Sequence, residues 1–362
     1  EKIVELKRKE AEKLGYEGHP YNALMDLYEE GLTTLDVDRI FPLLVSNLKR
    51  ILHHIISSKS FPTNHVLENV PYDEESMRRV NQEILRLLGM PEKTFRMDVS
   101  SHPFSINLSM DDVRITTTYE GRNFKETIFS VIHECGHALY TLQIDPSMDY
   151  TPLAGAPSAG LDESQSRFLE NFLGRSRAFT NLLHPILKRN LPFISEYSED
   201  DIYRYFNLVR PSPTREADEV TYNFHIFLRY ELEKKLLSGE VEVSDLPTIW
   251  DDMMDEYVGV RPKNMAEGVL QDVHWSWGHF GYFPTYTLGN VIAATVFNRM
   301  KRALDFQDVI RRGDMGPIKM WLKENIHKWG ATYSPKELQT KALGDVYNPE
   351  YLVRYLEEKY QA

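Results

Sequence analysis

Apolar residues recur at helical spacing through most of this chain, and that periodicity constrains its fold more than any other feature of the sequence. Leu48, Ile51, Leu52 and Ile55 show the pattern, since positions i, i+3, i+4 and i+7 share one face of an α-helix. The sequence therefore predicts a mainly α-helical fold. Helices are expected near residues 2–14, 22–31, 36–58, 74–89, 124–143, 161–176, 179–189, 198–208, 215–237, 244–258, 284–303, 315–328, 334–343 and 349–360.

One segment departs from the helical period. Residues 97–119 are β-like, and residues 112–119 alternate with period two and are rich in β-branched side chains. A strand there has a polar face with Asp112, Arg114 and Thr116, and an opposite face with Val113, Ile115 and Thr117. We expect a small β-hairpin region, whose polar face either lines a cleft or is simply solvated.

The charge balance argues against two classes of partner. The 362 residues include 42 Lys plus Arg and 54 Asp plus Glu, a net charge of −12. Nucleic acids and anionic membrane surfaces attract basic faces, so neither is expected to bind. The most apolar stretch, residues 291–297, is far shorter than the ~18 residues that a membrane span needs.

The single cysteine and the absence of linkers bear on location and domain organisation. Cys135 cannot form an internal disulfide, which suits a reducing compartment and predicts a cytoplasmic protein. Without a Ser/Gly-rich linker, low-complexity tract or internal repeat, the chain is expected to form one helical body over residues 1–362.

The strongest chemical signal is the H-E-x-x-H sequence of His133, Glu134 and His137. At about 100° per residue, the two histidines lie about 40° apart on a helix, opposite an apolar stripe. Both imidazoles can reach one Zn²⁺ at about 2 Å. The alternative interpretation is that the two histidines are packed or exposed side chains that bind no metal. Glu134 suits the role of general base toward metal-bound water. Asn123 and Glu126 resemble a capping box at the helix start.

A third metal ligand is expected on the following helix. Enzymes with this motif that use a carboxylate as third ligand place it there, and Glu163 lies thirty positions after His133 (163 − 133). The alternative is that Glu163 is a helix-start carboxylate, which the helix dipole also favours. Its position alone does not separate the two interpretations.

Residues 268–286 are dense in hydrogen-bond donors and aromatic rings, among them His274, Tyr282 and Tyr286. Attack by water places negative charge on the carbonyl oxygen of a peptide, and His or Tyr donors can stabilise that charge. An aromatic core around satisfied histidines is the alternative. Arg215, at an expected helix start, suits bidentate binding of a carboxylate, although most such arginines form surface ion pairs.

Taken together and in this order, the motifs resemble those of the metallocarboxypeptidases typified by carboxypeptidase Taq. The resemblance spans essentially the whole chain. Its markers are His102 to Phe104, Asp112 to Thr116, His133 to His137, Asp162 to Gln165, Arg215 to Asp218 and Gly268 to Trp275. It implies a mainly helical fold with a zincin-like H-E-x-x-H helix, a long substrate groove, one divalent metal, and removal of single residues from peptide C-termini.

The resemblance also implies residue roles. The metal, Zn²⁺ or alternatively Co²⁺, is bound by His133, His137 and Glu163, and Glu134 activates water. Candidates for polarising the substrate carbonyl are His274, Tyr282 and Tyr286. Candidates for binding a peptide with a free C-terminal carboxylate are Arg114, Arg215, His102, Gln271 and Asp272. A homodimer is expected from the family as well.

Three departures from the family pattern affect these expectations. Asp162 stands where the family usually has histidine, which adds negative charge beside the metal. The Arg215 cluster is one residue shorter than the family pattern, which places the role of Arg215 in doubt. The chain starts at Glu1 and is expected to lack N-terminal helices that the family carries.

Two other functions stay open at this point. One is an oligoendopeptidase of similar fold, which would not require a free carboxylate. The other is an inactive helical interaction protein with a vestigial site, against which Glu134 argues because a structural metal needs no base.

Overall fold

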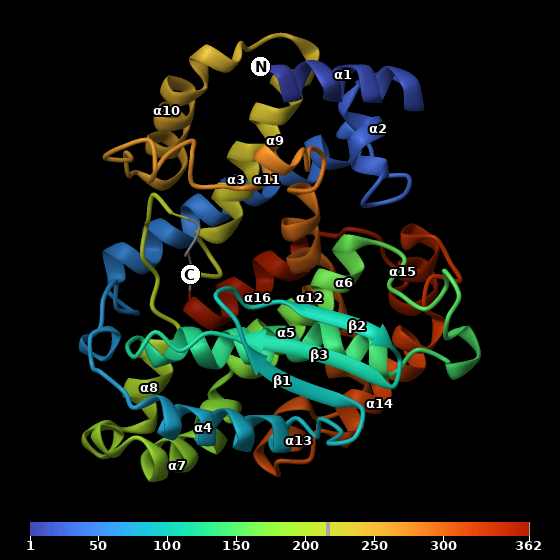
Figure 1. Ribbon diagram of the computed structural model, residues 1–362. Helices are drawn as coiled ribbons and strands as arrows, with labels where there is room; N and C mark the ends of the chain where they lie inside the picture. The colour runs from blue at the N-terminus through green and yellow to red at the C-terminus, as the bar shows by residue number, and fades with distance from the viewer. Residues whose placement is uncertain (215–217, 362) are drawn as a thin grey trace.

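The computed structural model describes residues 1–214 and 218–361, and its architecture is mainly helical, as predicted (Figure 1). The α-helices are α1 (Lys2–Leu14), α2 (Tyr21–Asp26), α3 (Thr34–Ser58), α4 (Glu74–Leu87), α5 (Phe124–Leu142), α6 (Ala159–Arg167), α7 (Arg177–Asn190), α8 (Glu199–Phe206), α9 (Tyr222–Ser238), α10 (Leu246–Val258), α11 (His274–Trp277), α12 (Pro284–Ala303), α13 (Phe306–Arg311), α14 (Gly316–Asn325), α15 (Pro335–Leu343) and α16 (Glu350–Tyr360).

The helix α3 shows how the sequence pattern becomes structure. A capping box starts it: the Thr33 hydroxyl accepts from the Asp36 amide at 3.3 Å, and Asp36 accepts from the Thr33 amide at 3.1 Å. The apolar positions that predicted the helix, Leu48 and Ile51 among them, are fully buried. The periodic stripe is therefore the face that packs into the core.

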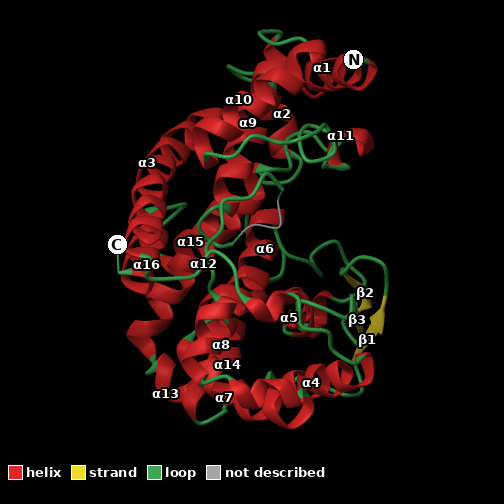
Figure 2. Cartoon of the chain, turned by 90° about the vertical axis from the view of Figure 1, so that its left-hand side faces the viewer, coloured by secondary structure: helices red, strands yellow, loops and turns green. Residues whose placement is uncertain are grey.

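The β-like segment forms a three-stranded sheet rather than a hairpin alone. Its strands are β1 (Phe95–Val99), β2 (Ser105–Ser109) and β3 (Asp112–Thr117), in the order β1-β3-β2. β2 and β3 make the expected antiparallel hairpin, but β1 pairs in parallel with the other edge of β3. On β3, Val113 and Ile115 are buried, whereas Arg114 is half-buried. The sheet lies beside α5, which contacts β3 (Figure 2).

Three helices that carry motif residues pack directly on one another. α5 contacts the sheet on one side and α6 on another, and α6 in turn packs against α12. A Cβ on Gly136 of α5 would lie 2.4 Å from the Cα of Ser166, and one on Gly289 of α12 would lie 2.7 Å from Cγ of Glu163. Glycine at both positions allows the backbones to approach this closely around Glu163.

Some predicted boundaries are corrected by the structure. α9 begins at Tyr222 instead of residue 215, because Asp218 accepts from the amides of Val220 and Thr221 and holds a turn there. Residues 215–217 lie outside the described residues. The helix predicted over residues 22–31 ends at Asp26, and the short helices α11 and α13 were not predicted.

Asn123 does not cap α5 in the predicted way. Its backbone is left-handed, with φ of 50°, and its side chain accepts no hydrogen bond from the first turn of the helix. The side-chain amide instead donates to Glu126 at 3.3 Å, and its oxygen accepts from the Tyr205 hydroxyl at 2.8 Å. Tertiary contact with α8 therefore replaces the expected local cap.

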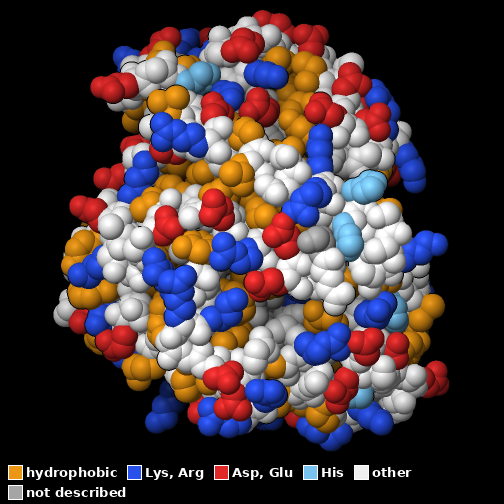
Figure 3. Space-filling view, turned by 180° about the vertical axis from the view of Figure 1, so that it is seen from behind, with side chains coloured by type: hydrophobic (Ala, Val, Ile, Leu, Met, Phe, Trp, Pro, Cys, Tyr) orange, Lys and Arg blue, Asp and Glu red, His pale blue; other side chains and the backbone are white. Residues whose placement is uncertain are grey.

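The molecular surface shows no segregation of charge on the face seen from behind. Lys and Arg side chains are interspersed there with Asp and Glu (Figure 3), so the net charge of −12 does not gather into one patch on this face. Among the described residues, none of the helices combines the length and the apolar character needed to cross a membrane.

Candidate active site

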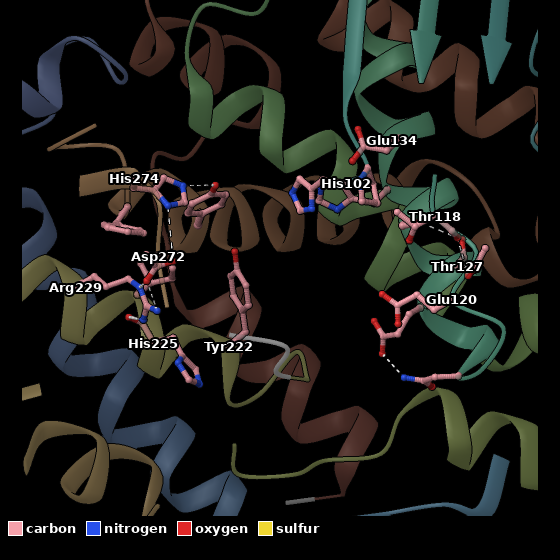
Figure 4. Close-up of a pocket in the computed structure, with 18 of the residues that line it drawn as sticks. His102, Thr118, Glu120, Thr127, Glu134, Tyr222, His225, Arg229, Asp272 and His274 are labelled. Carbon is pink, nitrogen blue, oxygen red and sulfur yellow. Dashed lines mark hydrogen bonds and ion pairs between the residues drawn. The ribbon is translucent and has the colours of Figure 1, made fainter. Parts of the chain in front are cut away.

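A cavity of about 460 Å³ adjoins the H-E-x-x-H helix. Glu120, Thr118 and Thr127, from the end of the β3 region and the start of α5, lie on one wall, and Arg229 and His274 lie on the opposite wall (Figure 4). Tyr222 stands between the walls, with its hydroxyl directed toward the middle of the cavity. His133 and Glu134 also line this space, so the motif opens onto a cavity large enough for part of a peptide.

The three predicted metal ligands are brought together. One donor atom from each of His133, His137 and Glu163 lies within 4.8 Å of the other two. Nε2 of His133 is 3.6 Å and Nε2 of His137 is 3.5 Å from Oε2 of Glu163. Two ligands bound at about 2.0–2.1 Å in a tetrahedron lie roughly 3.3–3.4 Å apart, so this donor set fits a divalent ion such as Zn²⁺.

Each of these histidines also meets a second carboxylate through Nδ1. His133 Nδ1 is 2.9 Å from Oε2 of Glu170 and hydrogen bonded to it, and His137 Nδ1 is 3.0 Å from Oδ2 of Asp162. The His137 contact has an ion-pair distance, although its atoms are not aligned as a hydrogen bond. Both imidazoles are thus oriented with Nε2 toward Glu163.

Two arginines neutralise the buried carboxylates on α6 and its continuation. Nε of Arg167 donates to Oε1 of Glu163 at 2.6 Å, and Arg175 donates to Glu170 at 2.9 Å. Burial raises the pKa of Glu163, but Arg167 and His133 lower it more, so the net pKa lies below its usual range. Glu163 therefore stays ionised, the state in which a carboxylate can bind a metal.

Glu170 contacts His133 from the helical segment that directly follows α6. Residues Phe168–Gly174 form a π-helical turn directly after Arg167. A π-turn takes in an extra residue, which rotates the side chains beyond it relative to a regular α-helix. Arg167, the last residue of α6, lies over the ring of Tyr222, with the guanidinium carbon 4.2 Å from the ring centroid.

Glu134 is held by the sheet. It is 7% exposed, and its Oε2 accepts a hydrogen bond from the hydroxyl of Ser105 in β2. The same hydroxyl lies 3.3 Å from the backbone oxygen of Glu134. The edge strand β2 thus orients the carboxylate that the sequence singled out as a base.

On the opposite wall, His274 is part of a chain of polar contacts. Its Nε2 lies 3.2 Å from the Tyr286 hydroxyl, and its Nδ1 lies 3.7 Å from Asp272. Arg229, fully buried against Trp250, donates from Nε to Asp272 at 2.6 Å. Burial raises the pKa of Asp272, but His274 and Arg229 outweigh it and lower the pKa to about 2.

The remaining predicted residues of this region take different positions. Tyr282 packs near His274, with the ring centroids 5.8 Å apart, and Tyr286 crosses Tyr282 edge-on at 5.1 Å. Gln271 donates to the backbone oxygens of Pro213 at 3.0 Å and Glu267 at 2.8 Å, so it ties the loop together. His102 lines the cavity beside Glu134 (Figure 4).

Of the two predicted carboxylate-binding arginines, the structure describes Arg114, which does not line the cavity. Arg114 makes a bidentate pair with Asp112, with both contacts at 2.7 Å, and is not among the residues that line the cavity. Arg215 lies outside the described residues. Arg122, which precedes α5 and was not singled out in the sequence, does line the cavity.

Several site residues escaped the sequence interpretation. Ser105 directly follows the marker segment His102 to Phe104. This position beside a family motif is the sequence feature that could have indicated its contact with Glu134. Glu170 and Arg167 recur at near-helical spacing after Glu163, which could have suggested a shared face. Nothing in the local sequence around Arg229 or Tyr222 indicates that they reach this cavity.

Comparisons with known proteins agree with the geometry. The model of the carboxypeptidase Taq (M32) metallopeptidases matches residues 1–360. The chain is 50% identical to thermostable carboxypeptidase 1 of Pyrococcus furiosus, over 99% of this chain and 73% of that protein. It is 38% identical to carboxypeptidase 1 of Bacillus subtilis, over 99% of this chain and 72% of that protein. A solved structure of Pyrococcus furiosus carboxypeptidase superimposes with a TM-score of 0.98 at 50% identity, covering 99% of this chain and 73% of that one.

Proposed function

The chain belongs to the carboxypeptidase Taq (M32) family of metallopeptidases, and we propose that it removes single residues from peptide C-termini with Glu134 as general base. The observation that carries this proposal is the meeting of His133, His137 and Glu163 beside a cavity that Glu134 also lines. A metal ligand set with an adjacent carboxylate base is the arrangement that hydrolysis by activated water needs.

We propose His133, His137 and Glu163 as the ligands of one divalent ion, with Zn²⁺ preferred and Co²⁺ as alternative. Two imidazoles and a carboxylate form a set that zinc enzymes use for catalysis, because it leaves a position for water or substrate. Bound there, the ion would polarise the scissile carbonyl and lower the pKa of water. Arg167 occupies Oε1 of Glu163 and leaves Oε2 facing the imidazoles.

Glu134 and the opposite wall supply the rest of the proposed chemistry. Glu134, oriented by Ser105, takes the proton of the attacking water and passes one to the leaving amine. His274, Tyr282 and Tyr286 are the proposed donors to the carbonyl oxygen as it gains negative charge. The contact between His274 and Asp272 favours a proton on Nδ1, which keeps one ring orientation.

Substrate binding is proposed for five residues: His102, Arg114, Arg215, Gln271 and Asp272. In this proposal an arginine grips the C-terminal carboxylate through its guanidinium fork. Gln271 and Asp272 would act by holding the loop that carries His274, since Gln271 donates to the backbone of Pro213 and Glu267 and Asp272 contacts Arg229 and His274. His102 would contact the peptide from the wall that holds Glu134.

The decisive experiment compares one peptide in two forms, with a free C-terminal carboxylate and with a C-terminal amide, in the presence of Zn²⁺ or Co²⁺. We expect stepwise release of single residues from the free peptide and little cleavage of the amide. Equal cleavage of both, at internal bonds, would refute the exopeptidase assignment and favour an oligoendopeptidase.

We propose further that residues 1–362 act as one catalytic domain, that the protein forms a homodimer and that it works in the cytoplasm. The family resemblance supports the dimer, and the single buried cysteine supports a reducing compartment. Light scattering coupled to size-exclusion chromatography tests the dimer, because a mass near 42.3 kDa would identify a monomer.

A further inference from the structure

The surroundings of the two metal-binding histidines differ in their charge. His133 Nδ1 faces Glu170, a carboxylate that Arg175 and Arg167 contact at 2.9 and 3.4 Å. His137 Nδ1 faces Asp162 at 3.0 Å. Among the described residues, Asp162 forms no ion pair with a lysine or arginine, and its side chain is 42% exposed.

A charge count around the proposed ligands shows what Asp162 adds. Glu163 and Glu170 contribute two negative charges, and Arg167 and Arg175 contribute two positive ones. These four groups balance. Asp162 also contacts this cluster. Within the described part of the chain, no guanidinium pairs with its negative charge.

A histidine that binds a metal through Nε2 carries its proton on Nδ1, and that N–H needs an acceptor. A carboxylate in this position fixes the ring and makes the imidazole a stronger ligand, and its removal commonly weakens metal binding 10- to 100-fold. Glu170 is hydrogen bonded to Nδ1 of His133, and Asp162 lies in the corresponding position for His137, 3.0 Å from its Nδ1.

We infer that Asp162 is a positioning residue that strengthens divalent metal binding, by orienting His137 and by supplying negative charge that the arginines of the site leave uncompensated. This inference rests on the proposed metal site. It goes beyond the proposed reaction, because it concerns how tightly the ion is held rather than how a peptide is cleaved.

The test measures Zn²⁺ binding to the whole chain without any peptide, by competition with a chromophoric chelator. We expect Asp162→Asn to raise the dissociation constant 10- to 100-fold, at both 0.1 and 0.5 M salt, because a direct contact is little screened. Asp111→Asn, which makes the same charge change at the exposed turn after β2, should stay within twofold of the unchanged chain.

An Asp162→Asn dissociation constant within twofold of the unchanged chain would overturn the inference. So would an equal loss in Asp111→Asn, since net charge rather than contact would then explain it. Asp162→Glu keeps the charge and should bind Zn²⁺ more tightly than Asp162→Asn, and the reverse order would also contradict the inference. Thermal unfolding of the metal-free variants checks that folding is unchanged, and peptide hydrolysis by the unchanged chain separately decides the proposed function.

Discussion

Gly136 of α5 and Ser166 of α6 lie so close that a Cβ on Gly136 would be 2.4 Å from the Cα of Ser166. Gly136 stands next to His137 in the motif, and Ser166 lies three residues after Glu163. The approach of the two backbones therefore brings the third proposed ligand to the imidazoles. Close helix packing at Gly136 therefore contributes to the grouping of the three proposed ligands.

Gly136→Ala is expected to lose both stability and metal binding. The added methyl would meet backbone atoms of Gln165 and Ser166, which cannot move aside as a side chain can. Overpacking of this kind costs roughly 1–3 kcal/mol or more. Urea unfolding and Zn²⁺ titration measure the two effects. Gly155→Ala is the matched control, because a Cβ at Gly155 meets nothing within 4 Å; equal behaviour of the two variants would contradict the prediction.

Glu134→Gln is expected to abolish the proton transfer while leaving the metal in place. General base catalysis contributes about 10²- to 10⁴-fold, so kcat should fall by that factor. Metal content by atomic absorption should stay at the level of the unchanged chain, because Glu134 is not one of the three proposed ligands. Glu92→Gln, at an exposed site, is the control. Unchanged hydrolysis by Glu134→Gln would rule out Glu134 as the base.

Ser105→Ala should lower kcat about tenfold and change KM little. The hydroxyl of Ser105 hydrogen bonds to the Glu134 carboxylate, and a hydrogen bond to a charged group is worth roughly 1.5–3 kcal/mol. Ser105→Thr keeps a hydroxyl and is expected to recover much of the rate. Ser109→Ala, at the other end of β2, controls for strand stability. A loss confined to KM would point to substrate binding instead.

The arginine variants test where the substrate carboxylate binds. If Arg114 binds this carboxylate, Arg114→Ala should lower kcat/KM for free-carboxylate peptides. The corresponding loss of transition-state stabilisation should be roughly 2–4 kcal/mol. Asp112→Ala should then lower KM, because Asp112 occupies two donors of that guanidinium. A larger loss in Arg122→Ala would move the anchor to Arg122, which lines the cavity.

Folding stability should decrease with pH through the titration of Glu29. Burial raises its pKa to about 7, against the hydrogen bonds from Tyr347, Ser158 and Gly160, which lower it. The folded chain therefore keeps this proton up to about pH 7, whereas the unfolded chain releases it near pH 4.5. The contribution of this proton to the free energy of unfolding is complete below pH 4.5 and is lost as the pH rises through about 7. The total loss is at most about 3 kcal/mol.

Glu29→Gln removes this titration. Urea unfolding at pH 5 and pH 8 should show the unchanged chain losing stability relative to Glu29→Gln as pH rises. Parallel pH dependence of the two chains would show that Glu29 does not titrate in this range.

The helical part of the fold was predictable because each helix is encoded by neighbouring residues. Leu48 and Ile51 repeat at the period of one turn, so the buried face of α3 can be read locally. The parallel pairing of β1 with β3 was not predicted. Phe95 and Val113 pair across the two strands, but the whole of β2 separates them in the sequence and no local pattern links them. The start of α9 was misplaced because the side chain of Asp218 competes with the helix.

The candidate site divides in the same way. By itself the sequence determined that His133 and His137 share one helix face with Glu134 between them, because a separation of four residues is one helical turn. Only the tertiary structure decided that Glu163 lies beside the two imidazoles. It also decided that Asp162 and Glu170 contact Nδ1 of His137 and His133, and that Ser105 donates a hydrogen bond to Glu134. Local periodicity is set by the covalent chain, whereas these contacts depend on how closely α5, α6 and the sheet pack.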